Sequence, residues 1–167
     1  ETGTDDIGDL GVVDGKIAEP TADAEVIDCA GKCLAPGIID IGVKVCEPGE
    51  RHKESFASAG RAAVAGGITT IITRPDTDPA IDTPEVLEFV ERRAAIDAAV
   101  NVLPMAALTK GRLGCEMTEI GFLMDAGAVA FTDCDRVITD TKVFSRALTY
   151  AKSCGALVIG HVQEPGL

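Results

Sequence analysis

Residues 36–49 read Pro-Gly-Ile-Ile-Asp-Ile-Gly-Val-Lys-Val-Cys-Glu-Pro-Gly, and the apolar stretch 38–45 within them predicts a buried β-strand. An alanine-rich segment, 55–65, follows and ends at Gly66-Gly67, which is typical of a helix with a glycine C-terminus. Residues 68–73 are rich in Ile and Thr and predict a second strand. This order of strand, helix and strand indicates a βαβ unit and therefore a parallel sheet.

The same alternation continues to the end of the sequence. Thr83-Pro84 predicts the start of a helix that runs to about residue 99, with Thr as the cap and Pro at the first helical position. The predicted buried stripe of that helix is Val86, Phe89, Val90 and Ala94. Further strands are predicted at 100–106, 128–131 and 156–160, and further helices at 115–126 and 141–154.

Five strands of this kind favour an α/β fold that is part of a (β/α)8 (TIM) barrel. A complete barrel needs about 250 residues, so residues 36–167 are expected to form its N-terminal part, truncated after Leu167. The alternative is a doubly wound sheet. Against it, no GxGxxG motif follows the first predicted strand.

Residues 1–35 have a different pattern, which predicts part of a small β-sandwich domain that precedes the barrel. Asp14-Gly15 lies between two short apolar runs and indicates a tight hairpin. Residues 26–29 and 33–35 are predicted to add two further short strands.

Composition narrows the classes of partner. The formal net charge is -12, which disfavours nucleic-acid backbones and anionic membrane surfaces. No apolar run reaches the roughly 20 residues of a membrane helix. The six cysteines lack zinc-type CxxC spacing and a secretory context, so we expect reduced thiols in a cytoplasmic protein.

The stretch 36–49 resembles a motif of dihydroorotases and related cyclic amidohydrolases: Pro-Gly, two apolar residues, Asp, an apolar residue, His-x-His, an apolar residue and Arg-Glu-Pro-Gly. Further similar segments follow in the same order over nearly the whole chain, at residues 53–55, 65–70, 75–79, 108–111 and 126–133. The resemblance implies an amidohydrolase barrel with a metal at the C-terminal ends of its strands.

The resemblance also implies that the ligands of that metal are degenerate here. Gly42 and Lys44 stand at the two His positions, and neither supplies a ligand for zinc. Cys46 stands at the position of an Arg that grips a substrate carboxylate, and Asp76 at that of a substrate-binding Asn. We expect the Lys44 ammonium to take the place of the metal charge and to pair with Asp76 or Asp133; Asp40 is a further candidate partner, because simple alternation places both residues on one face.

Two low-ranking metal candidates remain. The resemblance assigns the acidic ligand to Cys134, or to Asp133 after a one-residue slip, and retains His161 as a plausible ligand. Buried inert thiols and a hydrogen-bonded His at the rim are the simpler interpretation. A Schiff-base role for Lys44 would require a depressed pKa.

The resulting hypothesis is a dihydroorotase-like protein of pyrimidine biosynthesis that is catalytically inactive and needs no cofactor. It would act as a structural or regulatory partner, for example of aspartate transcarbamoylase, or as a homo-oligomer. The alternative is an active metal-dependent cyclic amidohydrolase that closes carbamoyl-aspartate to dihydroorotate. Its rebuilt zinc site would use Cys134, His161 and residues after Leu167.

Overall fold

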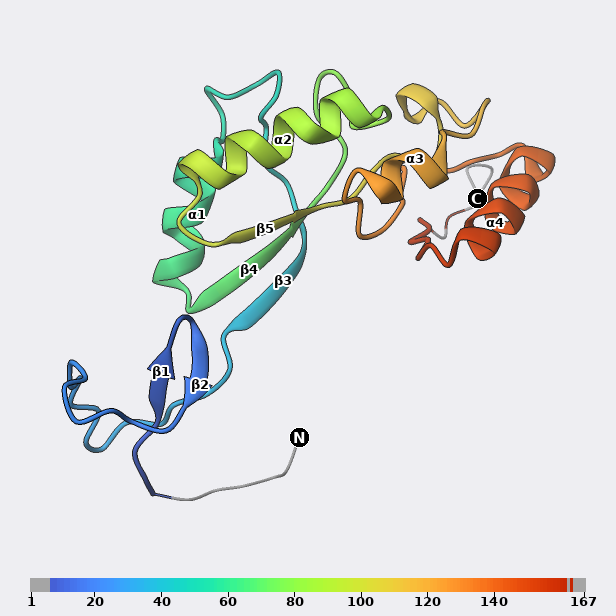
Figure 1. Cartoon of the computed structure of the whole chain (residues 1–167). Coiled ribbons are helices and arrows are strands. Elements are labelled where there is room, and N and C mark those ends of the chain that lie inside the picture. Colours follow the sequence, from blue (N-terminus) through green and yellow to red (C-terminus); the bar gives the residue numbers. More distant parts are fainter. Residues whose placement is uncertain (1–6, 162, 164–167) are drawn as a thin grey trace. The chain divides into compact units, whose positions relative to one another are not determined.

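The computed structural model describes residues 7–161 and 163, and the chain divides into two compact units, Glu1–Pro36 and Gly37–Leu167. The first unit contains an antiparallel hairpin of β1 (Gly11–Val13) and β2 (Lys16–Ala18) (Figure 1). Its turn residues Asp14 and Gly15 both have positive φ, 50° and 73°, as a two-residue hairpin loop requires.

The strands predicted at 26–29 and 33–35 are not formed, so that prediction was wrong. These segments are exposed and find no partner strand in the described part of their unit; instead Lys32 donates its backbone N–H to the Cys29 carbonyl (2.9 Å) in a turn. The small β-sandwich assigned to residues 1–35 stays a prediction.

The second unit is built on a parallel sheet in the order β3 (Ile38–Val43), β4 (Ile68–Thr73) and β5 (Asn101–Pro104). The parallel pairing then continues through single bridges, from Ala106 to Phe131 and from Phe131 to Val158. The segments predicted as the fourth and fifth strands therefore have the expected direction but not the expected length. One cause is a turn after Thr132. The Thr132 hydroxyl accepts a hydrogen bond from the Cys134 N–H (3.0 Å), and this turn directs the chain away from the neighbouring strand segments.

Helices α1 (Phe56–Ala65), α2 (Pro84–Asp97) and α4 (Thr141–Cys154) form close to their predicted positions. Their ends follow from local chemistry. Ser55 forms a capping box with Ser58, and the Asp140 carboxylate accepts hydrogen bonds from the backbone of Lys142 and Val143. Gly155 ends α4 in the left-handed conformation at φ 71°.

Helix α3 (Ile120–Asp125) is only the second half of the predicted helix 115–126. The first half is held in a loop instead. Met117 forms an antiparallel bridge with Thr109, and the Thr118 hydroxyl donates to the Ala107 carbonyl (2.8 Å). These contacts occupy the backbone and side chains of a loop that also contains the short 3-10 helix η1 (Lys110–Arg112).

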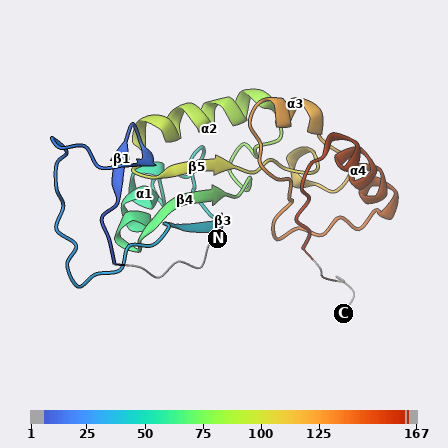
Figure 2. The same ribbon diagram turned by 60° about the horizontal axis from the view of Figure 1, so that its bottom comes forward.

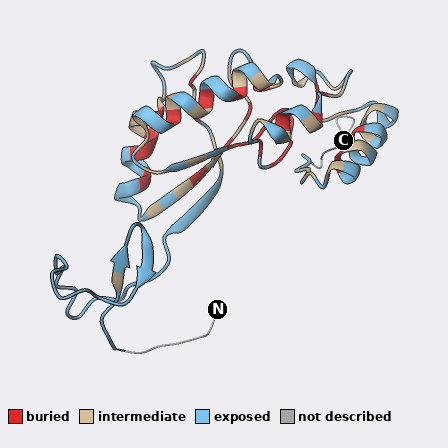
Figure 3. Cartoon of the chain, in the orientation of Figure 1, coloured by how far each residue is buried: buried red, intermediate tan, exposed pale blue. Residues whose placement is uncertain are grey.

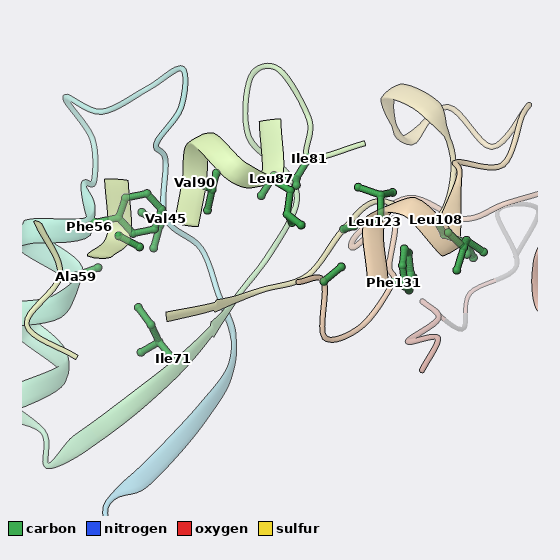
Figure 4. Packing of buried hydrophobic residues seen from close by; sticks show 14 of the residues in the cluster. Val45, Phe56, Ala59, Ile71, Ile81, Leu87, Val90, Leu108, Leu123 and Phe131 are labelled. Atoms are coloured by element: carbon green, nitrogen blue, oxygen red, sulfur yellow. The ribbon is translucent and has the colours of Figure 1, made fainter. Parts of the chain in front are cut away.

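The core lies between the sheet and its helices. Helices α1 and α2 cover one face of β3–β4–β5 (Figures 1 and 2). Residues coloured as buried occur along α1 and α2 and around α3 (Figure 3). Phe56, Ile71 and Val90 belong to the buried hydrophobic cluster (Figure 4). On α2 the buried residues are Leu87, Val90 and Ala94, and Val86 is half-buried against the core, whereas the predicted Phe89 is 38% exposed.

Glu47 ties the loop after β3 to two helices. Its carboxylate is buried and accepts hydrogen bonds from the Phe56 backbone N–H (3.3 Å) and from Arg93 Nε (3.2 Å), and it pairs with Arg51 Nε (3.3 Å). Phe56 begins α1 and Arg93 belongs to α2. One buried negative charge therefore holds three segments of the chain together.

We expect Glu47→Gln to lower the free energy of unfolding by about 2 kcal/mol, because it leaves buried hydrogen-bond donors without a charged acceptor. Urea unfolding measures the effect. Glu50→Gln is the matched control, since Glu50 lies three residues away on the surface and pairs only with Lys53 among the described residues, so its loss should leave the midpoint unchanged. Equal midpoints for the two variants would show that Glu47 does not hold these segments together.

Candidate functional site

The candidate site is the edge of the sheet where the parallel strands end. Lys44 follows β3, Arg74 follows β4, and residues 133–135 follow the bridge at Phe131. Because parallel strands have their carboxyl ends at the same edge, residues far apart in the sequence meet here. This is also the edge at which barrel enzymes place their chemistry.

A chain of ion pairs runs along this edge. Lys44 Nζ lies 3.0 Å from Asp76 Oδ2, and Arg74 Nη2 lies 2.9 Å from the same oxygen. Arg74 also reaches Asp135 Oδ1 at 3.8 Å, and Asp135 in turn pairs with Arg112. Loops after β3, β4, β5 and the Phe131 bridge are thereby joined by alternating charges.

Lys44 is held in its charged form. Its hydrogen bond to Asp76 is the main cause that raises its pKa, and the charge of Asp76 adds to the effect. The raised pKa removes the neutral amine that a Schiff base requires. Of the predicted partners of Lys44, the structure selects Asp76.

Asp40 makes no ion pair among the described residues, because the β3–β4 register shifts between Ile41 and Val43 and breaks the alternation that would align it with Lys44. The break is at Gly42, which has φ 90°, in a region that side chains rarely adopt. Open space surrounds the position where a Cβ would stand, so backbone strain rather than crowding opposes a larger residue at this position.

The buried carboxylate of Asp133 is fully engaged in the fold. It accepts hydrogen bonds from the backbone N–H groups of Leu108 and Thr109 (3.0 Å each) and from the Thr109 hydroxyl. These hydrogen bonds fix the loop after β5, and Lys44 pairs with Asp76 instead.

Cys134 and Cys46 are half-buried free thiols. Burial raises the pKa of the Cys134 thiol, the charge of Asp76 raises it further, and Arg74 opposes them. Since the thiolate is the ligand and the nucleophile, a raised pKa disfavours both roles for Cys134 at neutral pH.

His161 lies on an exposed segment that follows the bridge at Val158. Its Nε2 is 2.9 Å from Gln163 Oε1, and it lines a small cavity of about 100 Å³ together with Asp133 and Phe144. Within the described residues, no three His, Cys, Asp or Glu side chains gather in a group able to hold a metal ion. No helix of the described part is long and apolar enough to cross a membrane.

Comparison with known proteins identifies the family. Residues 31–167 match the family described as dihydro-orotase-like. The chain belongs to this family. It is 41% identical over 152 residues to the dihydroorotase of Sulfurihydrogenibium sp. (strain YO3AOP1), covering 91% of this chain and 36% of that protein. It is 40% identical over 169 residues to the dihydroorotase of Geotalea daltonii (strain DSM 22248 / JCM 15807 / FRC-32), covering 98% and 40%.

This dihydro-orotase-like chain therefore spans about two fifths of the length of these curated relatives. A solved structure confirms the fold. The L-hydantoinase (dihydropyrimidinase) from Arthrobacter aurescens superposes with a TM-score of 0.72 at 24% identity, over 92% of this chain and 36% of that one. The fold of this parallel α/β unit is thus similar to about a third of that chain, and the complete (β/α)8 barrel stays a prediction.

Three members of the ion chain were not predicted from the sequence: Arg74, Asp135 and Arg112. Arg74 had a usable signal, since a charge directly after a buried strand of a parallel sheet is placed at the functional edge. Arg112 and Asp135 had none, because their pairing depends on two loops that meet only in the folded chain.

Buried polar atoms also remain without partners among the described residues: Thr73 Oγ1, Arg74 Nε and Asp76 Oδ1.

We expect Asp76→Asn to lower the pKa of Lys44 toward its ordinary value, because the substitution removes the negative charge that holds the proton. An NMR titration of the lysine Nζ signals measures this, and Lys110, whose pKa Glu116 raises, should be unaffected. Because the folded-state pKa of Lys44 is raised, the stability that the pair contributes is complete below the ordinary lysine pKa of about 10.4 and is lost as pH rises through the folded value. An unchanged Lys44 titration in Asp76→Asn would contradict the pairing.

Proposed function

We propose that this chain belongs to a catalytically silent dihydroorotase homologue, a protein of the pyrimidine-biosynthesis amidohydrolase family that lacks the hydrolytic reaction. The observation that carries the proposal is the ion pair between Lys44 and Asp76 at the strand edge. A protein cation, rather than a cradle of metal ligands, lies where this family is expected to place its metal.

The donor set at this edge does not fit zinc. Gly42 has no ligand atom, and its φ of 90° opposes replacement by a residue that has one. Lys44 is protonated and repels a divalent ion. Asp76 already balances two cations, Lys44 and Arg74. The chemistry that zinc supplies when bound, activation of water and polarisation of a carbonyl, therefore has no support from these residues.

Substrate binding is proposed to be weakened independently of the metal. Cys46 offers no charge-assisted grip on a carboxylate where the resemblance expects Arg. Asp76 presents a carboxylate where the resemblance expects the neutral amide of Asn, although Lys44 and Arg74 partly neutralise it. The residues proposed to weaken substrate binding thus differ from Gly42, at the expected metal position.

A role without turnover follows as part of the proposal. We infer that the protein acts as a structural or regulatory partner, with aspartate transcarbamoylase as the leading candidate and self-association as the second. Support for this role comes from the resemblance and from the fold, in which the core and the helix caps are formed.

Co-purification tests the partner role. The protein and the aspartate transcarbamoylase of the same organism are expected to elute together in size-exclusion chromatography at micromolar concentration. Elution of the protein by itself as a larger species would favour the homo-oligomer. Elution of the protein and aspartate transcarbamoylase as separate species, with this protein at its monomeric size, would contradict the partner role.

The proposed lack of catalytic activity is tested directly by assaying hydrolysis of dihydroorotate. The assay uses the full-length protein, produced in a host without dihydroorotase and supplied with zinc. We expect turnover no higher than that of the buffer, since loss of the metal removes several kcal/mol of transition-state stabilisation. Elemental analysis of the protein purified without chelator, before zinc is added, should find no stoichiometric zinc. About one equivalent of zinc that disappears in Cys134→Ser and His161→Ala would instead favour the rival, an active enzyme with a rebuilt site.

A rescue series tests which losses matter. Gly42→His with Lys44→His should not restore hydrolysis, because the backbone at residue 42 disfavours a side chain and because the substrate-binding residues are still absent. Adding Cys46→Arg and Asp76→Asn should be required for any turnover, which is measured by the same assay. Activity in the double variant alone would show that Cys46 and Asp76 do not limit the reaction.

A further inference from the structure

A second hollow lies beside the ion chain and is not used by the function proposed above. It is a cavity of about 400 Å³ lined by Arg112, Leu113, Asp135, Arg136, Val137 and Gln163. This volume suits a small metabolite. Its lining thus combines two arginines, one aspartate and one glutamine with the apolar residues Leu113 and Val137.

The two arginines are held in place by the fold. Arg112 donates from Nε and Nη2 to the Asp133 carbonyl (3.2 Å each), and its side chain is only 11% exposed. Arg136 donates from Nη1 to the carbonyls of Arg112 (3.1 Å) and Gly111 (3.4 Å). Both charges are thus positioned before any ligand arrives, which lowers the entropy cost of binding.

The backbone around the cavity is strained. Among the described non-glycine residues, positive φ occurs at Asp14, Arg112 and Cys134. Asp14 is explained by its hairpin turn. Arg112 lines the cavity and Cys134 precedes its Asp135, both at φ 58°. Such strain tends to persist at ligand-binding positions.

Asp135 behaves as an internal anion in this site. Its carboxylate pairs with Arg112 and lies 3.8 Å from Arg74, yet its side chain remains 70% exposed. A group so exposed is held mainly by charge, and a ligand with the same charge can exchange with it. Carboxylates and phosphates are the anions that the arginine fork recognises.

We propose that this cavity binds a small molecule that carries a carboxylate or phosphate group, held by Arg112 and Arg136, and that Asp135 is the internal group which this anion displaces. The apolar flank formed by Leu113 and Val137 accommodates a short hydrocarbon body. The proposal concerns binding and does not depend on whether the protein hydrolyses dihydroorotate.

Isothermal titration calorimetry of the intact protein tests the proposal, with inorganic phosphate and succinate as probes and chloride at equal ionic strength as the blank. Asp135→Asn removes the internal competitor and should bind the better probe at least tenfold more tightly than the unmodified protein. Preference for phosphate identifies a phosphoryl ligand, and preference for succinate identifies a carboxylate.

Arg136→Gln in the Asp135→Asn background should lose at least tenfold in affinity. Lys110→Gln in the same background is the matched control, because Lys110 carries an equal charge nearby but pairs with Glu116 and does not line the cavity, so the affinity should change less than twofold. Thermal melting verifies that each variant is folded. The proposal is overturned if Asp135→Asn binds neither probe more tightly than the unmodified protein, or if Arg136→Gln binds as well as its parent.

Discussion

The parallel ladder of backbone hydrogen bonds is the constraint on which the rest of this molecule depends. It aligns β3, β4 and β5 and extends through Ala106, Phe131 and Val158 in single bridges. Because every strand runs in the same direction, the loops that follow the strands are collected at one edge. Lys44, Arg74 and Asp135 meet there although up to 91 residues separate them along the chain.

The charges at this edge pair with one another. Asp76 is nearly buried, with 5% of its side chain exposed, and a carboxylate in such a position needs a compensating charge. In this chain Lys44 and Arg74 supply it from the protein itself.

Two buried carboxylates organise the loops around the edge by different means. Glu47 gathers an α1 backbone N–H and two arginines, so it joins helices to the loop after β3. Asp133 accepts backbone and hydroxyl hydrogen bonds from Leu108 and Thr109, so it shapes the loop after β5. Asp133 also presents its carbonyl to Arg112, and the scaffold of the fold thereby positions a side chain of the neighbouring cavity.

The sequence alone determined the α/β alternation, three of the helices, the first three strands and the N-terminal hairpin. These elements follow from local causes: apolar periodicity, Ser55 and Asp140 as caps, Gly155 as a helix end and Asp14-Gly15 as a turn. It also placed Lys44 and Asp76 at the same edge. Only the tertiary structure decided that these two pair, that Asp133 is committed elsewhere, and that Arg74, Asp135 and Arg112 extend the network. The half-length α3 was likewise decided by contacts between segments, because hydrogen bonds from a distant loop compete with local preference and no pattern within one segment records them.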